Sequence, residues 1–128
     1  MTAAGTLVGI GLDSVDIARF ASMLARRDTL RSRLFTAREC AYADGLANPV
    51  PSLAARFAAK EAVMKSLGVG LGALDWWDVE VHSRPSGEPV LGVTGRAAAL
   101  AARRGVATWQ LSLTHTDSVA SAIVAALS

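Results

Sequence analysis

The sequence is short of cysteine, aromatic residues, clustered charge and long apolar runs. Cys40 is its one cysteine, so no disulfide can form within the chain. Net charge is only +2 with no block of lysine and arginine, which argues against nucleic acid as a partner. No apolar run approaches the roughly 18 residues of a membrane span, which argues against a membrane protein. A lone thiol, with no basic and apolar signal segment at residues 1–4, favours a cytoplasmic location.

What the sequence does have is alanine. Hydrophobic residues make up 52% of the chain but aromatic residues only 5%, because alanine supplies much of the apolar content. A chain of 128 residues suits one domain with a single modest core. A core of small side chains is thin and leaves apolar surface uncovered. We therefore expect a single domain, residues 1–128, that associates with copies of itself.

Hydrophobic periodicity predicts an α+β domain. Predicted helices cover residues 16–27, the segment from 36 to a loop at 48–51, residues 53–67 with Ser52 as cap, and residues 95–104. Predicted strands cover residues 6–12, 78–82, 90–93, 108–114 and 119–127, the first of them buried. Hairpin-like neighbours favour a largely antiparallel sheet packed against the long central helix of residues 53–67.

Two carboxylates stand out in apolar surroundings, where a charge is costly unless it is paired or binds a metal. Asp13 follows the first predicted strand, and Glu61 lies in the alanine-rich central helix. Glu61 also has the spacing for a surface ion pair with Lys65. Asp13 also has the position of a helix cap, although Asp16 fills that role equally well. If the fold brings them together, Asp13 and Glu61 form the sparse oxygen set that Mg²⁺ uses with substrate phosphates.

Cations surround Glu61 along the sequence. Arg56 and Lys60 are like charges four residues apart, a mildly unfavourable arrangement that an anion between them would reverse. The combination suits a phosphate held partly by Mg²⁺. Gly68 and Gly70 follow the helix, where glycines commonly serve only to stop it. Their backbone N–H groups are also able to hold a phosphate.

Two further features admit a functional and a structural interpretation. His115 ends a predicted strand, as a loop-facing polar residue or as part of a site. Arg19 and Arg26 flank Met23 on a predicted helix, which gives an apolar centre with a basic rim. That face is either an ordinary solvated surface or a docking site for an acidic helix of a partner.

Taken together, these residues resemble holo-acyl-carrier-protein synthases, the short bacterial type of 4′-phosphopantetheinyl transferase. The resemblance covers nearly the whole chain, through GIGLD at residues 9–13, RFAAKEA at 56–62, the Gly87 and Pro89 hairpin and SLTH at 112–115. It implies the transferase fold and a homotrimer with sites between subunits. Many relatives have threonine where this chain has Val69, so a hydroxyl contact there is not implied.

The resemblance also implies a reaction in fatty-acid biosynthesis. The 4′-phosphopantetheine arm of coenzyme A moves to a serine of an apo acyl carrier protein and releases adenosine 3′,5′-bisphosphate. It implies these roles: Asp13 and Glu61 as Mg²⁺ ligands; Arg56, Lys60, Lys65, Gly68, Gly70 and His115 at coenzyme A; Arg19, Met23 and Arg26 at the carrier protein.

For the mechanism we expect in-line attack at the β-phosphorus, with Asp13, Glu61 and Lys65 as the catalytic group. A carboxylate or metal-bound water takes the serine proton. Two other functions fit the same residues. One is a coenzyme A- or nucleotide-binding module without catalysis, and the other is an assembly subunit in which both carboxylates are structural.

Overall fold

The computed structural model describes residues 5–128, so residues 1–4, on which the expectation of no signal segment rests, lie outside it. Within the described range, no helix is both long enough and apolar enough to cross a membrane. The elements follow in the order β1 (Leu7–Asp16), α1 (Ile17–Arg26), α2 (Leu30–Leu34), α3 (Ala37–Asp44), α4 (Val50–Ser66), the 3₁₀ helix η1 (Trp76–Asp78), β2 (Val79–Ser83), β3 (Pro89–Val93), α5 (Gly95–Arg103), β4 (Thr108–His115) and β5 (Val119–Leu127).

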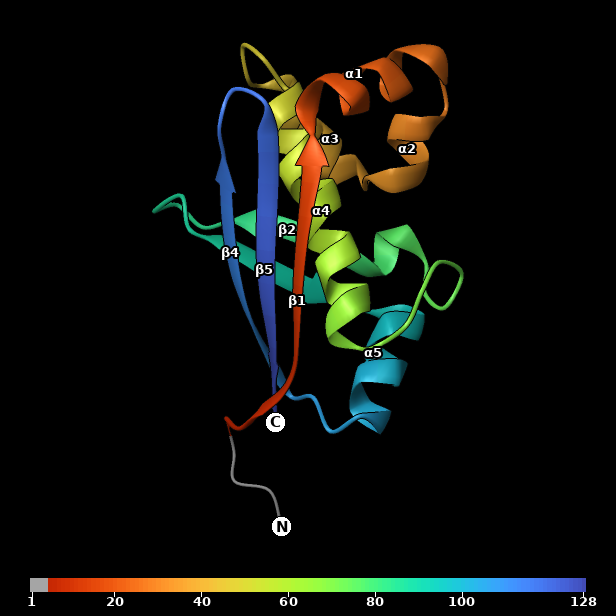
Figure 1. Ribbon diagram of the computed structural model, residues 1–128, viewed down its shortest axis with the longest axis vertical. Coiled ribbons are helices and arrows are strands. Elements are labelled where there is room, and N and C mark those ends of the chain that lie inside the picture. Colours follow the sequence, from red (N-terminus) through yellow and green to blue (C-terminus); the bar gives the residue numbers. More distant parts are fainter. Residues whose placement is uncertain (1–4) are drawn as a thin grey trace.

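The strands form two antiparallel sheets, which confirms the predicted α+β class. β1, β5 and β4 form a three-stranded sheet in that order, and β2 and β3 form a separate hairpin. The three long strands stand in front of α4 (Figure 1). Helices α1 to α3 gather at one end of the molecule and α5 lies at the other, so α4 is the central helix that the sequence predicts.

Small side chains line the contact between α4 and this sheet. Ala58 and Ala62 of the helix are fully buried, and so are Ala120 and Ala126 of β5. Small side chains allow a helix and a sheet to pack at short range. Larger core side chains such as Phe20 collect beneath α1 and α2 instead. The core is therefore thin where the helix meets the sheet, as the composition suggests.

Two glycines bring β1 into direct contact with the backbone of α4. A Cβ atom on Gly9 would lie 2.0 Å from the carbonyl oxygen of Ser66, and one on Gly11 would lie 1.9 Å from that of Ala62. No side chain fits at these distances, which explains why glycine occupies both inward positions. Alternate strand residues point to the same face, so Asp13 is the next residue directed at α4.

Replacing Gly11 with alanine should therefore destabilise the protein by about 3 kcal/mol, because β1 would have to move away from α4 to admit the methyl group. Gly70→Ala is the matched control, since a Cβ atom there would meet nothing within 4 Å. Urea unfolding of both variants measures the difference. A Gly11 variant as stable as the control would contradict this account of the contact.

β1 differs from the predicted strand in two respects. It runs to Asp16, so Asp13 lies within the strand and not at its exit. Its outward side chains are also exposed, with Ile10 57% and Leu12 61% accessible to solvent. The prediction of a buried strand is wrong because an apolar strand has the same sequence pattern whether one or both of its faces are covered.

The helix boundaries also differ from the prediction. α4 begins at Val50 and not after Ser52, since Pro51 is tolerated in the first turn of a helix. The short helix α2 (Leu30–Leu34) was not expected at all. The N-cap of α1 is Asp16, whose Oδ1 accepts a hydrogen bond of 2.9 Å from the backbone of Arg19. Asp13 is thus free for another role.

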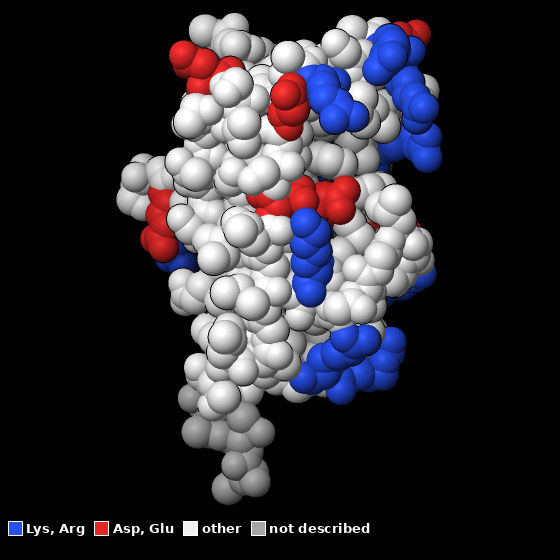
Figure 2. Space-filling model, viewed as in Figure 1, with Lys and Arg blue, Asp and Glu red and all other residues white. Residues whose placement is uncertain are grey.

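The outer face of the three-stranded sheet carries uncovered apolar side chains. Val8, Ile10 and Leu12 of β1 lie beside Val119 and Ile123 of β5, and all five are exposed. Figure 2 shows this face nearly free of charge: one small group of both signs lies near the middle of the view, and the other charged side chains lie toward its edges. Nothing within residues 5–128 covers these side chains, and we call this surface the outer sheet face.

Candidate active site

Asp13 and Lys65 form an ion pair across the contact between β1 and α4. The Lys65 Nζ lies 2.8 Å from Oδ1 of Asp13 and also donates to the carbonyl oxygen of Leu12 at 3.0 Å. Hydrogen bonding to Asp13 raises the pKa of Lys65, so the ammonium stays charged at neutral pH. Lys65 thus pairs with Asp13, and the surface pair with Glu61 considered above does not form.

Glu61 lies beside this pair in a hollow of about 260 Å³, which we call the carboxylate hollow; its lining residues are Asp13, Ser14, Val15, Asp16, Arg19, Phe20, Met23, Phe57 and Glu61. The pKa of Glu61 is raised, first by burial and then by the charge of Asp13, while Lys65 lowers it. Counting Asp16, three carboxylates line the hollow, against Arg19 and the adjacent Lys65, so positive charge falls short of negative charge there.

This shortage of positive charge fits a divalent cation. Among the described residues, no group of three or more histidine, cysteine, aspartate and glutamate side chains forms a ready-made metal site. Asp13 and Glu61 supply two oxygen donors, and Mg²⁺ is often held by one or two carboxylates, with waters and substrate phosphates as its other ligands. The residues present therefore suit Mg²⁺ bound together with a phosphate substrate.

The predicted docking helix borders the same hollow. Arg19 and Met23 of α1 line the carboxylate hollow on one side. On the outer side they join Arg26 along a shallow surface depression. Arg31, which the sequence places in the same run of arginines, instead pairs with Asp44. The predicted docking residues Arg19, Met23 and Arg26 therefore lie together on α1, beside the hollow that holds Asp13 and Glu61.

Arg56 and His115 meet in a second hollow, of about 450 Å³, which we call the arginine hollow; it is lined by Tyr42, Leu46, Asn48, Pro51, Ser52, Ala55, Arg56, Leu113, Thr114 and His115. Arg56 is buried, with only 4% of the residue exposed to solvent. Its Nη1 donates to the Ser52 hydroxyl at 2.6 Å, and its Nε has no partner. Burial lowers the pKa of Arg56, and the nearby Tyr42 and Glu39 only partly offset this effect.

The two hollows open beside different edge strands. β1 borders the carboxylate hollow and β4 borders the arginine hollow, with β5 between them. Arg56 and Glu61 are five residues apart on α4, so they point about 140° apart around the helix axis. The structure therefore brings together Asp13, Glu61, Lys65 and the docking helix, and separately Arg56 with His115, but not these two groups with each other.

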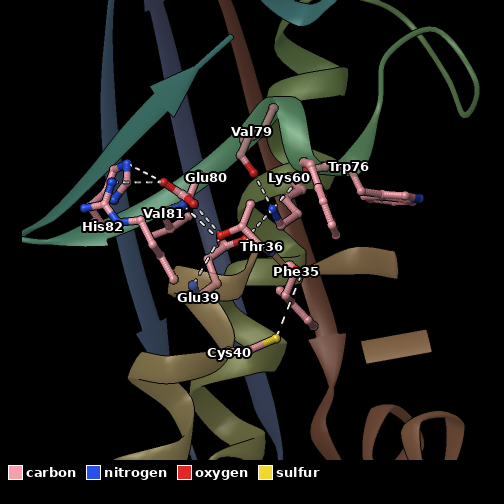
Figure 3. A network of polar contacts seen from close by, with 12 residues as sticks. Phe35, Thr36, Glu39, Cys40, Lys60, Trp76, Val79, Glu80, Val81 and His82 are labelled. Carbon is pink, nitrogen blue, oxygen red and sulfur yellow. Dashed lines mark hydrogen bonds and ion pairs between the residues drawn. The ribbon is translucent and has the colours of Figure 1, made fainter. Parts of the chain in front are cut away.

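Lys60 is not where the sequence predicts it. Its side chain is fully buried, and its Nζ donates to Oε1 of Glu39 at 2.8 Å, to the carbonyl of Trp76 at 3.0 Å and to that of Val79. Figure 3 shows the ammonium enclosed by these oxygens. The prediction that Lys60 contacts a phosphate is therefore wrong for this structure, since every hydrogen of its ammonium is already used.

Glu39 completes this buried network from α3 (Figure 3). Its Oε1 accepts from the backbone of Thr36 in a capping box, and its Oε2 accepts from the backbone of Val81 at 3.0 Å. Sequence reasoning recognises the spacing of Thr36 and Glu39 as a helix start. It misses the second role of Glu39, because no local pattern links it to Lys60 or to β2. The network ties α3, α4 and β2 together.

The glycine loop follows the end of α4. Gly68 has φ of +69° and Gly72 of +91°, conformations that L side chains rarely adopt. Gly68 ends the helix as predicted. A Cβ atom on Gly70 would meet nothing within 4 Å, so its backbone faces open space and is accessible to a ligand.

Comparison with known proteins identifies the class. The model of the 4′-phosphopantetheinyl transferase superfamily matches residues 9–124, and the chain belongs to this superfamily. Among its members, a holo-[acyl-carrier-protein] synthase of Frankia casuarinae is 53% identical over 120 residues, which cover 94% of this chain and 97% of that protein. These findings confirm the resemblance deduced from the sequence.

Solved structures of the same enzyme share the fold. The holo-[acyl-carrier-protein] synthase of Neisseria meningitidis superposes with a TM-score of 0.85 at 27% identity, covering 94% of this chain and 98% of that one. The Bacillus anthracis enzyme, in complex with CoA (3′,5′-ADP), gives a TM-score of 0.80 at 32% identity over 95% and 97% of the two chains. That protein therefore binds coenzyme A on this fold.

Proposed function

We propose that this chain transfers the 4′-phosphopantetheine group of coenzyme A to a serine of apo acyl carrier protein, releasing adenosine 3′,5′-bisphosphate. The observation that carries the proposal is the carboxylate hollow, in which Asp13 and Glu61 lie beside Arg19 and Met23 of the docking helix. A serine presented by a protein docked on α1 would arrive beside the two carboxylates. Relatives named for this reaction support it. We further propose a cytoplasmic location, which the single free thiol of Cys40 supports.

The residues of the hollow have distinct roles. Asp13 and Glu61 would hold Mg²⁺, which would supply positive charge against the coenzyme A diphosphate. Lys65, held by Asp13, offsets the charge that builds on the departing bisphosphate. The backbone of the loop at Gly68 and Gly70, which is open at Gly70, supports the same diphosphate. In the attack, the serine oxygen bonds to the β-phosphorus as the bond to the bisphosphate oxygen breaks, and a carboxylate of the hollow takes the serine proton.

We further propose that the protein is a homotrimer in which each site is shared. The outer sheet face is apolar and uncovered in one chain, and it separates the edge strands that border the two hollows. A neighbouring copy packed on this face would place its Arg56 and His115 across from Asp13 and Glu61 of the first copy. Coenzyme A bound between the two copies would then lie between Lys65 of one copy and Arg56 of the other.

Intact-mass measurement tests the reaction directly. Apo carrier protein incubated with coenzyme A, Mg²⁺ and this protein should gain the mass of one phosphopantetheine arm, and a chelator should prevent the gain. Binding of coenzyme A with no gain in mass would favour the non-catalytic module. Neither binding nor a gain would favour the assembly subunit.

Arg19→Glu should raise the KM for the carrier protein about tenfold or more and leave the KM for coenzyme A within twofold. The reason is that Arg19 lines the docking face, where a carboxylate would repel an acidic partner. Steady-state kinetics with each substrate varied in turn measure both constants. Arg84→Glu is the control, since Arg84 is exposed on the far hairpin and contacts neither hollow. Equal changes in both constants would argue against this docking face.

Sharing of sites predicts complementation between inactive variants. Glu61→Gln and Arg56→Gln should each be nearly inactive alone, but trimers assembled from an equal mixture should recover about a quarter of the wild-type activity. About three quarters of random trimers are mixed, and each of these holds about one third of the normal number of intact sites. Unfolding and refolding the two together, then assaying transfer, measures the recovery. No recovery from well-mixed trimers would place the whole site within one chain.

A further inference from the structure

The surroundings of Arg56 are unusual for a buried cation. Buried arginines are normally paired with a carboxylate. Around Arg56 the polar partners are instead two neutral hydroxyls, Ser52 at 2.6 Å from Nη1 and Ser83 at 3.4 Å from Nη2. Its Nε is buried and makes no hydrogen bond. The guanidinium is thus held in place with no carboxylate in direct contact with it.

An aromatic ring completes these surroundings. The guanidinium carbon of Arg56 lies 4.4 Å from the centre of the Tyr42 ring, within the range of a cation–π contact. The ring attracts the cation through its negative face without neutralising it, which a carboxylate at this position would do. Tyr42 and Arg56 both line the arginine hollow, together with His115. The ring therefore orients the guanidinium and leaves its charge available to an anion.

The helix that carries Tyr42 is itself fixed. Glu39 lies three residues earlier on α3, on the same side of the helix. It is bonded to Lys60 of α4 and to the backbone of Val81 in β2. α3 therefore has a defined position relative to α4, so the Tyr42 ring is held opposite Arg56. The buried network around Glu39 therefore fixes α3, and α3 in turn fixes the Tyr42 ring against Arg56.

We propose that Tyr42 is a positioning residue, whose ring holds the plane of the Arg56 guanidinium in the orientation that binds a phosphate group of coenzyme A. The inference rests on the role proposed for Arg56 above. The proposal concerns the orientation of Arg56. It assigns a function to Tyr42, which lies outside the sequence motifs described above.

The test compares Tyr42→Leu with Tyr42→Phe, because phenylalanine keeps the ring and leucine removes it. We expect Tyr42→Leu to raise the Kd for adenosine 3′,5′-bisphosphate, measured by calorimetry, about fivefold. The KM for coenzyme A should rise to the same extent with kcat within twofold of wild type, and Tyr42→Phe should behave as wild type. Trp77→Leu is the control, since Trp77 is 56% exposed, compared with 45% for Tyr42, and lies outside this hollow.

A double-mutant cycle shows whether Tyr42 acts through Arg56. In an Arg56→Gln background, with Arg56→Met as a second background, Tyr42→Leu should change the Kd by less than about 1.5-fold. The same fivefold loss with and without Arg56, or a Tyr42→Phe variant as weak as Tyr42→Leu, would overturn the proposal. A wild-type protein that binds the bisphosphate but transfers nothing would contradict the proposed function, and the cycle of Kd values would still decide the role of Tyr42.

Discussion

Lys60→Met should lower the free energy of unfolding by about 3–5 kcal/mol, the largest stability change expected from one substitution in this chain. Lys60 and Glu39 are both fully buried, at 2.8 Å from each other. Without the ammonium, the Glu39 carboxylate would remain buried with no cation, and the carbonyls of Trp76 and Val79 would lose their donor. Urea unfolding monitored by circular dichroism measures the loss.

The double variant Glu39→Gln, Lys60→Met shows how much of the lost free energy of unfolding comes from the ion pair and how much from changed packing. Because it removes both charges, it should be more stable than the sum of the two single substitutions predicts. Arg38→Met is the matched surface control, since Arg38 is 76% exposed and lies 3.6 Å from Glu80. It should change the stability by less than about 1 kcal/mol. Additive losses in the double variant would show that the pair is not coupled.

Glu61→Gln should reduce Mg²⁺-dependent transfer by about a thousandfold without lowering the melting temperature of the metal-free protein. The amide keeps the shape of the side chain and loses its charge. The raised pKa of Glu61 means that the folded state disfavours the ionised form, because of burial and the neighbouring Asp13. At neutral pH the neutral amide should therefore fold at least as stably as the carboxylate.

The pH dependence gives an independent check. A raised pKa makes the wild type lose stability relative to Glu61→Gln as the pH rises through the pKa of the folded state. Below about pH 4 the carboxyl is largely protonated in both states, so the two proteins should melt at similar temperatures. Added Mg²⁺ should raise the melting temperature of the wild type only. Glu88→Gln, at an exposed hairpin residue, serves as control. Normal Mg²⁺-dependent turnover by Glu61→Gln would eliminate the metal role.

Much of the carboxylate hollow is predictable because its signals are local. Glycine at alternate positions before Asp13 indicates a strand that packs closely on another backbone, and Glu61 lies within an unmistakable helix. The structure places both carboxylates in the same hollow, beside the docking face on α1. The antiparallel α+β class is likewise predictable, because hairpin neighbours are close in sequence.

The position of Lys60 is not predictable in this way. α4 is buried on most of its sides, so the helix shows no clear polar face from which to read the direction of a charge. The partner of Lys60 is Glu39, 21 residues earlier, and its other acceptors are backbone carbonyls of η1 and β2. Tyr42 is missed for the same reason, since its contact with Arg56 depends on the packing of α3.

The glycine contact between β1 and α4 has a practical consequence for enzyme redesign. The contact holds β1, which carries Asp13, directly against α4, which carries Glu61. The side chains expected to meet the carrier protein all lie on a third element, the ten-residue helix α1. If α1 docks the carrier protein as proposed, recognition depends on a different element from the two that carry the carboxylates. Exchanging the outward-facing positions of α1 between relatives should then change which carrier is used, with Asp13 and Glu61 left in place.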